Sequence, residues 1–233
     1  MKCSILAAAA LAAALSFTQG AAALTWNEID AGEVPVSAEI PLGSPGAALT
    51  GITGRLDVVA LLDNTFAYQV DLFGIRITDA ATFSATATAG SDDTALFLFD
   101  MDGFGVYASD DTASGLNPTL TPYSGLSNGL YYLGVAQGGF SARDGLGEDL
   151  FVQPAGLTEL AYGNPASGPL DSWLDGFGAN ADSSLGYTIT LTGASVTPVP
   201  EPSAALMLAL GLGGLVALRR RQRHTARSAH HAG

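Results

Sequence analysis

The chain has 233 residues, with 22 acidic residues against 9 lysines and arginines, 3 histidines and 1 cysteine. Charged residues make up 13% of the chain and apolar residues 48%, whereas soluble domains typically carry about 25% charged residues. This composition excludes disorder driven by charge, and a single cysteine excludes a scaffold held by internal disulfides. The 29 glycines predict many turns rather than long helices.

The charges are distributed unevenly along the chain. Every acidic residue except Glu201 lies within residues 24–197, where the only basic residues are Arg55, Arg76 and Arg143. A body this acidic repels phosphate backbones, so we expect no nucleic-acid partner. Two interpretations of the acidity remain open: it keeps an extracellular protein soluble, or it binds Ca²⁺.

Histidine and cysteine are missing from this body. The histidines are His224, His230 and His231, and the cysteine is Cys3, so all four lie near the ends of the chain. Ser-His-Asp catalysis, Cys-His catalysis and a histidine-based zinc site are therefore excluded for residues 24–197. Paired carboxylates can support glycoside hydrolysis, but acids spread so widely give no specific signal. We expect that the protein is not an enzyme.

Residues 1–23 have the three-part pattern of a secretory signal peptide. Lys2 supplies the positive start, an uncharged apolar run follows from Ile5 to Leu15, and Ala21–Ala23 fits the small-residue cleavage rule. We therefore expect export by the Sec machinery, which leaves a mature chain without cysteine.

A second export signal occupies residues 198–223. We expect an extended, exposed stretch at Val199, Pro200, Glu201 and Pro202. A proline disfavours helical conformation both at its own position and at the residue before it. The uncharged segment 204–218 is a predicted transmembrane helix. Fifteen helical residues rise only ~22 Å, which is shorter than the ~30 Å hydrocarbon layer, so the helix needs its flanking residues to span the membrane. The arginine cluster at 219–223 places the polar tail, 224–233, in the cytoplasm.

The order of extended stretch, apolar helix and arginine cluster resembles the PEP-CTERM sorting signal. The resemblance implies recognition by an exosortase, a membrane-embedded transpeptidase-like enzyme of Gram-negative bacteria. It also implies transient anchoring in the inner membrane, followed by delivery to the cell surface or to an exopolysaccharide matrix. The tail beyond residue 223 is longer than the family usually carries. A plain C-terminal anchor is the alternative.

The body between the two signals is predicted to be all-β. Tyr187, Ile189 and Leu191 alternate with threonines in residues 186–192, which indicates a half-buried strand. Further strands are expected at 66–72, 75–78, 82–89, 95–99, 106–109 and 130–137, while the apolar run 56–62 fits a strand or a short helix. Short strands separated by turn signals predict a jelly-roll-like antiparallel β-sandwich over residues 24–197.

Several of these segments, in the same order, resemble the bacterial pre-peptidase C-terminal domain, a jelly-roll-like β-sandwich. The resemblance rests on residues 68–72, 93–103, 108–111, 129–135 and 187–191 and covers about 66–193. It implies an accessory or binding module, in a family of which some members handle Ca²⁺ or matrix polymers. No peptidase precedes the domain here, and segment 141–184 is longer than the last connection of that family.

The predicted hairpin of strands 95–99 and 106–109 has aspartates at both ends. We expect four of them to converge at one end and to be candidate Ca²⁺ ligands, since oxygen ligands from two loops suit this cation: Asp92, Asp93, Asp110 and Asp111. Asp100 and Asp102 lie at the other end. Because Asp-Gly favours a tight turn by itself, turn formation is the alternative role for these aspartates.

Segment 141–184 is predicted to be a long irregular loop, which is where binding sites are often found. Trp173 can stack on a sugar ring while Asp171 and Asp175 bond its hydroxyls, or it can simply anchor the loop to the core. The sequence thus predicts an exported, noncatalytic surface or matrix protein that contacts extracellular polysaccharide. A lectin-like, glycan-binding module is the alternative.

Overall fold

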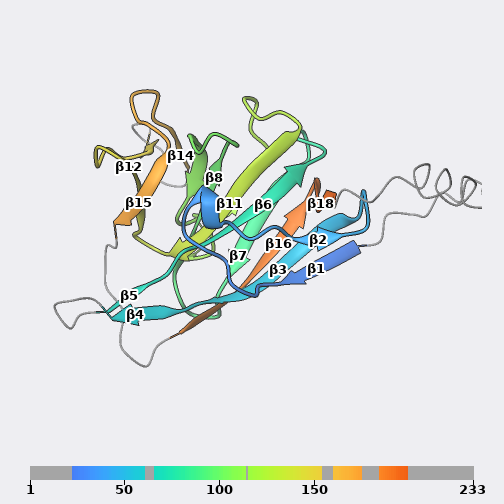
Figure 1. Cartoon of the computed structure of the whole chain (residues 1–233), viewed down its shortest axis with the longest axis horizontal. Coiled ribbons are helices and arrows are strands. Elements are labelled where there is room, and N and C mark those ends of the chain that lie inside the picture. Colours follow the sequence, from blue (N-terminus) through green and yellow to red (C-terminus); the bar gives the residue numbers. More distant parts are fainter. Residues whose placement is uncertain (1–22, 61–65, 114, 154–159, 175–183, 199–233) are drawn as a thin grey trace, which may run out of the picture.

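The computed structural model describes residues 23–60, 66–113, 115–153, 160–174 and 184–198 (Figure 1). In this part of the chain the regular structure is β-strand, apart from one turn of 3₁₀ helix at Pro35–Ser37. The predicted all-β class is therefore confirmed. Nearly all of the expected signal peptide and the whole expected transmembrane segment, 204–218, lie outside the described residues. Within the described ranges, no helix is long and apolar enough to cross a membrane.

Twelve strands form one sheet. Eleven of them follow a single path of neighbours: β10 (Thr119–Leu120), β7 (Ser84–Thr88), β16 (Leu185–Thr192), β3 (Ala48–Leu56), β17 (Ala194–Ser195), β6 (Asp71–Ile77), β11 (Gly129–Gln137), β8 (Thr94–Phe99), β9 (Gly105–Ser109), β14 (Ala161–Gly163) and β13 (Phe151–Val152). The twelfth, β1 (Ala23–Asn27), pairs with β3. Three two-stranded ribbons complete the fold: β12 (Ser141–Asp144) with β15 (Leu170–Leu174), β4 (Val58–Ala60) with β5 (Phe66–Tyr68), and β2 (Leu42–Gly43) with β18 (Thr197–Pro198).

The sheet curls over itself at the short strand β17. Ser195 pairs with Ala48 of β3 on one side and with Arg76 of β6 on the other, so this strand joins the two halves of the sheet. The expectation of two separate antiparallel sheets is thus modified to one continuous, curled sheet. Two pairs, β1 with β3 and β2 with β18, are parallel, which is a further departure from the antiparallel prediction.

The main core fills the space between the two halves. The predicted alternation of β16 is confirmed, because Tyr187, Ile189 and Leu191 are buried and the residues between them are exposed. Ile189 packs in the same cluster as Phe73 of β6 and Leu98 of β8, and none of the three has exposed surface. Apolar residues from both halves therefore supply the stability that a chain with one cysteine cannot take from disulfides.

A second core lies on the outer face of β8, β9 and β11. Phe97 and Phe99 of β8 point away from the main core, and the β12–β15 ribbon covers them beside β14 (Figure 1). The Trp173 ring meets Phe97 edge-on at 5.0 Å and Phe99 at 5.9 Å, between ring centroids. Because β8 carries apolar side chains on both faces, it is buried on both sides.

Several sequence expectations about individual elements are wrong. The predicted strand 66–72 is broken into β5 and the start of β6, which runs on through the separately predicted strand 75–78. In the apolar run 56–62, β3 ends at Leu56 and Val58–Ala60 form a strand, so the helical alternative is excluded for those residues. Segment 141–184 is not wholly irregular, because it contains β12, β13, β14 and β15. Tertiary pairing gives these segments a strand partner that no local pattern reveals.

The substitution Ile189→Ala is expected to lower the free energy of unfolding by about 2–5 kcal/mol. The removed side-chain atoms leave a cavity that the surrounding core cannot fully close. Urea denaturation of the full chain measures the change. The matched control is Thr190→Ala on the exposed face of the same strand, which is expected to stay within about 0.5 kcal/mol. Equal effects of the two substitutions would show that this face of β16 is not the core face.

Candidate functional site

One end of the β8–β9 hairpin gathers the polar groups that the sequence singled out. The predicted hairpin is confirmed, with Leu96 opposite Ser109 and Phe97 opposite Ala108. Strand β11 pairs with β8 on its other side, and Gln137 at its end lies opposite Thr94 at the start of β8. Since β8 is antiparallel to both neighbours, its start lies at the same sheet edge as the ends of β9 and β11.

Three of the four aspartates proposed as Ca²⁺ ligands lie close enough to influence one another at this edge. Burial, and then the charge of Asp111, raises the pKa of Asp93 above its usual value. Burial and the charge of Asp93 raise the pKa of Asp110 to about 6, against an amide N–H of Gly139 that donates to its carboxylate at 3.4 Å. The fourth aspartate, Asp92, is exposed.

The aspartates at the opposite end of the hairpin form a turn. Asp100 Oδ1 accepts hydrogen bonds from the backbone N–H of Asp102 at 3.0 Å and of Phe104 at 2.9 Å. Gly103 has a φ of 88°, which glycine tolerates better than other residues. The turn-forming alternative is therefore confirmed for Asp100. Among the described residues, no group of three or more histidine, cysteine, aspartate or glutamate side chains is placed to hold a metal ion.

A pocket of about 240 Å³ opens beside this edge, on the face of the second core. Its apolar lining includes Phe97, Phe140 and Phe151, and its polar lining includes Asp110, Ser141, Asp149 and Gln153. Aromatic faces next to a few polar groups are typical of small-molecule sites. Sequence reasoning pointed to segment 141–184 but did not place Phe97 or Asp110 beside it, because these two residues come from a different part of the chain.

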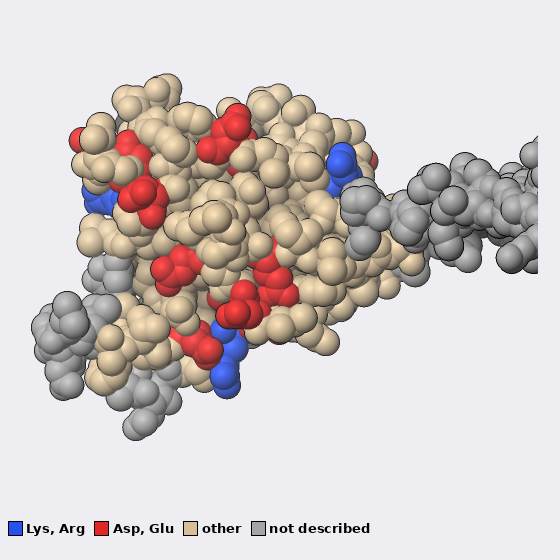
Figure 2. Space-filling view, viewed as in Figure 1, with Lys and Arg blue, Asp and Glu red and all other residues tan. Residues whose placement is uncertain are grey.

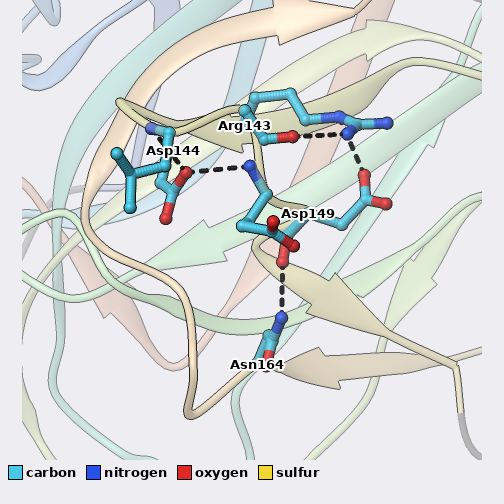
Figure 3. Close-up of polar contacts among 7 residues, drawn as sticks. Arg143, Asp144, Asp149 and Asn164 are labelled. Carbon is cyan, nitrogen blue, oxygen red and sulfur yellow. Dashed lines mark hydrogen bonds and ion pairs between the residues drawn. The ribbon is translucent and has the colours of Figure 1, made fainter.

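A polar turn follows β12 and leads to Asp149, which lines the pocket (Figure 3). The backbone N–H of Gly168 donates to Asp144 Oδ2 at 2.7 Å, and those of Leu146 and Glu148 donate to Oδ1, both at 2.9 Å. These hydrogen bonds, that of Gly168 above all, hold the pKa of Asp144 below its usual value. Arg143 Nε lies 2.9 Å from Asp149 Oδ1, in an ion pair. The Asp144 and Asp149 carboxylates are thus already engaged within the protein.

The structure gives Trp173 a packing role. Its ring contacts Phe97 and Phe99, and its Nε1–H donates to the backbone oxygen of Glu33 at 2.7 Å. Asp171 on the same strand is exposed, and Asp175 lies outside the described residues. The anchoring alternative for Trp173 therefore agrees with its contacts, and a sugar would have to use whatever part of the ring stays exposed.

A buried carboxylate that the sequence did not reveal lies elsewhere, in the main sheet. Asp71 is 4% exposed, and the hydroxyl of Tyr187 donates to its Oδ2 at 2.6 Å. Burial, which acts against the hydrogen bond from Tyr187, raises the pKa of Asp71 to about 7 together with smaller effects of the charges of Glu28, Asp57 and Glu39. The sequence did not reveal the burial of Asp71, because the strand that carries it pairs with segments that are distant in sequence.

The free energy of unfolding is expected to fall as the pH rises from about 4 to about 7. The raised pKa of Asp71 means that the folded state binds more protons than the unfolded state in this range, and Asp110 acts in the same direction up to about pH 6. Asp71→Asn cannot ionise, so it should make this decline shallower in urea denaturation curves measured across the range. Asp102→Asn, at an exposed turn, should keep the wild-type slope.

Comparison with known protein families finds a match near the C-terminal end of the chain. Residues 198–222 match the model of the PEP-CTERM protein-sorting motif. No curated protein matches the chain. The matched segment begins at Pro198, in the last described strand, and includes Val199, Pro200, Glu201 and Pro202. The motif indicates an exported protein that is anchored in a membrane transiently, processed by an exosortase and delivered to the cell surface.

Proposed function

We propose that this chain is a noncatalytic component of the cell surface or exopolysaccharide matrix of a Gram-negative bacterium. The observation that carries the proposal is the sorting motif at residues 198–222. An N-terminal Sec signal at residues 1–23 supplies the first export step in this proposal. The cargo is the acidic all-β domain between the two signals.

The position of the motif relative to the fold supports removal of the tail without damage to the domain. In β18, Thr197 pairs with Leu42 and Pro198 with Gly43, so the last described strand ends directly before Val199. Cleavage after this point removes no strand of the described sheet. The processed domain therefore keeps both of its cores.

The acidic surface supports a role in which the protein meets other matrix components through divalent cations. Acidic side chains form several separate groups on the face shown in Figure 2, whereas basic side chains lie at few places. Such a surface repels acidic polysaccharide unless cations bridge the two. The buried Asp71 is bonded to Tyr187, and Asp149 to Arg143, so these carboxylates have structural partners that favour a noncatalytic role.

Replacing Pro200, Glu201 and Pro202 together by alanine is expected to block processing, because the exosortase then loses its recognition stretch. Mass spectrometry of protein from cell fractions should find the wild type without its arginine-rich tail. The variant should keep the tail and stay with the membrane. A control substitution beyond the arginines, His230→Ala, should leave processing unchanged. Wild-type protein with an intact tail in the cytosol would overturn the proposal.

A glycan-binding role is the second candidate, favoured by the pocket beside segment 141–184. Phe140 and Phe151 offer rings on which a sugar can stack, and Ser141 and Gln153 offer groups that can bond its hydroxyls. In this candidate role the sugar contacts these pocket residues rather than Trp173, on which the sequence analysis expected it to stack, because Trp173 does not line the pocket.

Gln153→Ala is expected to abolish binding of any sugar that a glycan array identifies, because it removes a polar group of the pocket. Val152→Ala, which truncates the preceding, half-exposed side chain outside the pocket lining, is the matched control and should keep the hit. Loss of binding in both variants, or in neither, would refute the pocket as the sugar site, and an array without any hit would refute the glycan-binding role.

A further inference from the structure

Four buried side-chain oxygens at the edge formed by β8, β9 and β11 have no hydrogen-bond partner within the described residues. They are Asp93 Oδ1, Thr94 Oγ1, Asp111 Oδ1 and Gln137 Oε1. Thr94 has no exposed surface at all. A buried polar atom without a partner costs roughly 1–3 kcal/mol, and more when it is charged, so a cluster of four requires an explanation.

The four residues lie at the same end of neighbouring strands β8, β9 and β11. Thr94 and Gln137 are direct cross-strand partners, so their side chains leave the same face of the sheet about 5 Å apart at Cβ. Asp93 precedes Thr94, and its carboxylate lies against Gly138, where a Cβ would collide with it. Asp111, just after β9, is close enough to Asp93 for its charge to raise the pKa of that carboxylate.

The nearby donors are already engaged. The backbone N–H of Gly138 donates to the backbone oxygen of Asp93 at 3.1 Å, and that of Gly139 to the carboxylate of Asp110 at 3.4 Å. The described part of the chain has only three arginines and no lysine, and its two ion pairs use Arg55 and Arg143 with other aspartates. Neither of these ion pairs includes Asp93 or Asp111, so among the described residues no arginine is paired with these two carboxylates.

We propose that these four oxygens bind a Ca²⁺ ion that ties together the ends of β9 and β11 and the start of β8. Asp93 and Asp111 supply two negative charges, Gln137 an amide oxygen and Thr94 a hydroxyl oxygen. Water and backbone carbonyls complete the six to eight oxygen ligands that Ca²⁺ takes. Two of the four ligands are neither acidic nor histidine or cysteine, so the set does not require the three-residue acidic group that is absent from the described residues.

The oxygen atoms of the four side chains favour Ca²⁺ over other metal ions. All four groups are hard oxygen donors, which suit Ca²⁺ or Mg²⁺ rather than zinc or copper. Mg²⁺ demands a near-ideal octahedron and keeps most of its water, whereas irregular protein oxygens from three strands fit the more flexible shell of Ca²⁺. The candidate set is narrower than the sequence suggested: Asp92 is exposed, and Asp110 is bonded to Gly139 and lines the neighbouring pocket.

The biological supply of Ca²⁺ to this site depends on the proposed export of the chain. Extracellular Ca²⁺-binding modules have dissociation constants of about 10⁻⁴–10⁻³ M, and with two carboxylates we expect a value in this range. The site would then be filled outside the cell and empty in the cytoplasm, where free Ca²⁺ is far below this range. The domain would gain stability only after export.

Calorimetric titration of the purified full chain with CaCl₂ tests the proposal. One site with a submillimolar to millimolar dissociation constant is expected, together with a higher melting temperature in 10 mM CaCl₂ than in 10 mM MgCl₂. Asp111→Asn should weaken binding at least about tenfold, because half of the ligand charge is lost. The matched control, Asp92→Asn, removes an exposed neighbouring carboxylate and should change the affinity less than about twofold.

Thr94→Val keeps the proposal falsifiable if Asp111→Asn does not fold. It removes an unpartnered hydroxyl in a nearly isosteric way, so it should weaken Ca²⁺ binding while leaving the Ca²⁺-free protein as stable as the wild type or more stable. No heat and no melting shift with Ca²⁺ would overturn the proposal and indicate that water satisfies these oxygens. Equal losses in Asp111→Asn and Asp92→Asn would overturn it as well, since they indicate diffuse binding to the acidic surface.

The outcome of the Ca²⁺-binding measurements does not depend on whether the C-terminal tail is removed in cells. Binding is measured on purified protein, so a chain that binds Ca²⁺ but keeps its C-terminal tail in cells would refute the proposed sorting and leave the site intact. A processed chain without Ca²⁺ binding would refute the site and leave the sorting intact.

Discussion

Burial of apolar side chains between the two halves of the curled sheet is the interaction on which the rest of the structure depends. Ile189, Phe73 and Leu98 come from strands far apart in sequence, and each is fully buried in the same cluster. With a single cysteine, the chain has no internal disulfide to replace this contribution. The short strand β17 makes it possible, because its pairing with both β3 and β6 turns one sheet into two facing layers.

The curled sheet also determines where polar side chains gather, which is at the start of β8 and the ends of β9 and β11. A strand buried on both faces has room for polar side chains only at its ends, and β8 is apolar from Ala95 to Phe99. Thr94 at its start lies opposite Gln137 of β11, and Asp93 lies close enough to Asp111, which follows β9, to be influenced by its charge. The neighbouring pocket lies on the same side, since Trp173 of the β12–β15 ribbon packs on Phe97 and Phe99 while the pocket opens beside Phe97 and Asp110. The proposed cation site and the pocket thus share an edge of the sheet while involving different carboxylates.

Sequence patterns predicted the elements whose signals are local. Alternation revealed β16, the hairpin of β8 and β9 followed from two apolar runs with Asp102-Gly103 between them, and Asp100 was recognised as part of a turn. The patterns failed where a partner decides the conformation. Strands β1, β2, β12 and β13 are short or partly exposed, and they are strands because they pair with segments up to 155 residues away. Asp71 gave no signal either, because its burial follows from the packing of Tyr187 against it.

The sequence by itself determined the class and the destination of this protein. Glycine-rich alternation indicates an all-β fold, and the terminal sorting motif, which matches residues 198–222, is contiguous and therefore readable without a structure. The sequence also predicted that Asp93, Asp110 and Asp111 converge, because a hairpin links positions that are close along the chain. Only the tertiary structure decided that Thr94 lies opposite Gln137 at this edge and that Asp92 is exposed. Pairing between β8 and β11 and the degree of burial choose these residues, and both depend on contacts that no local pattern encodes.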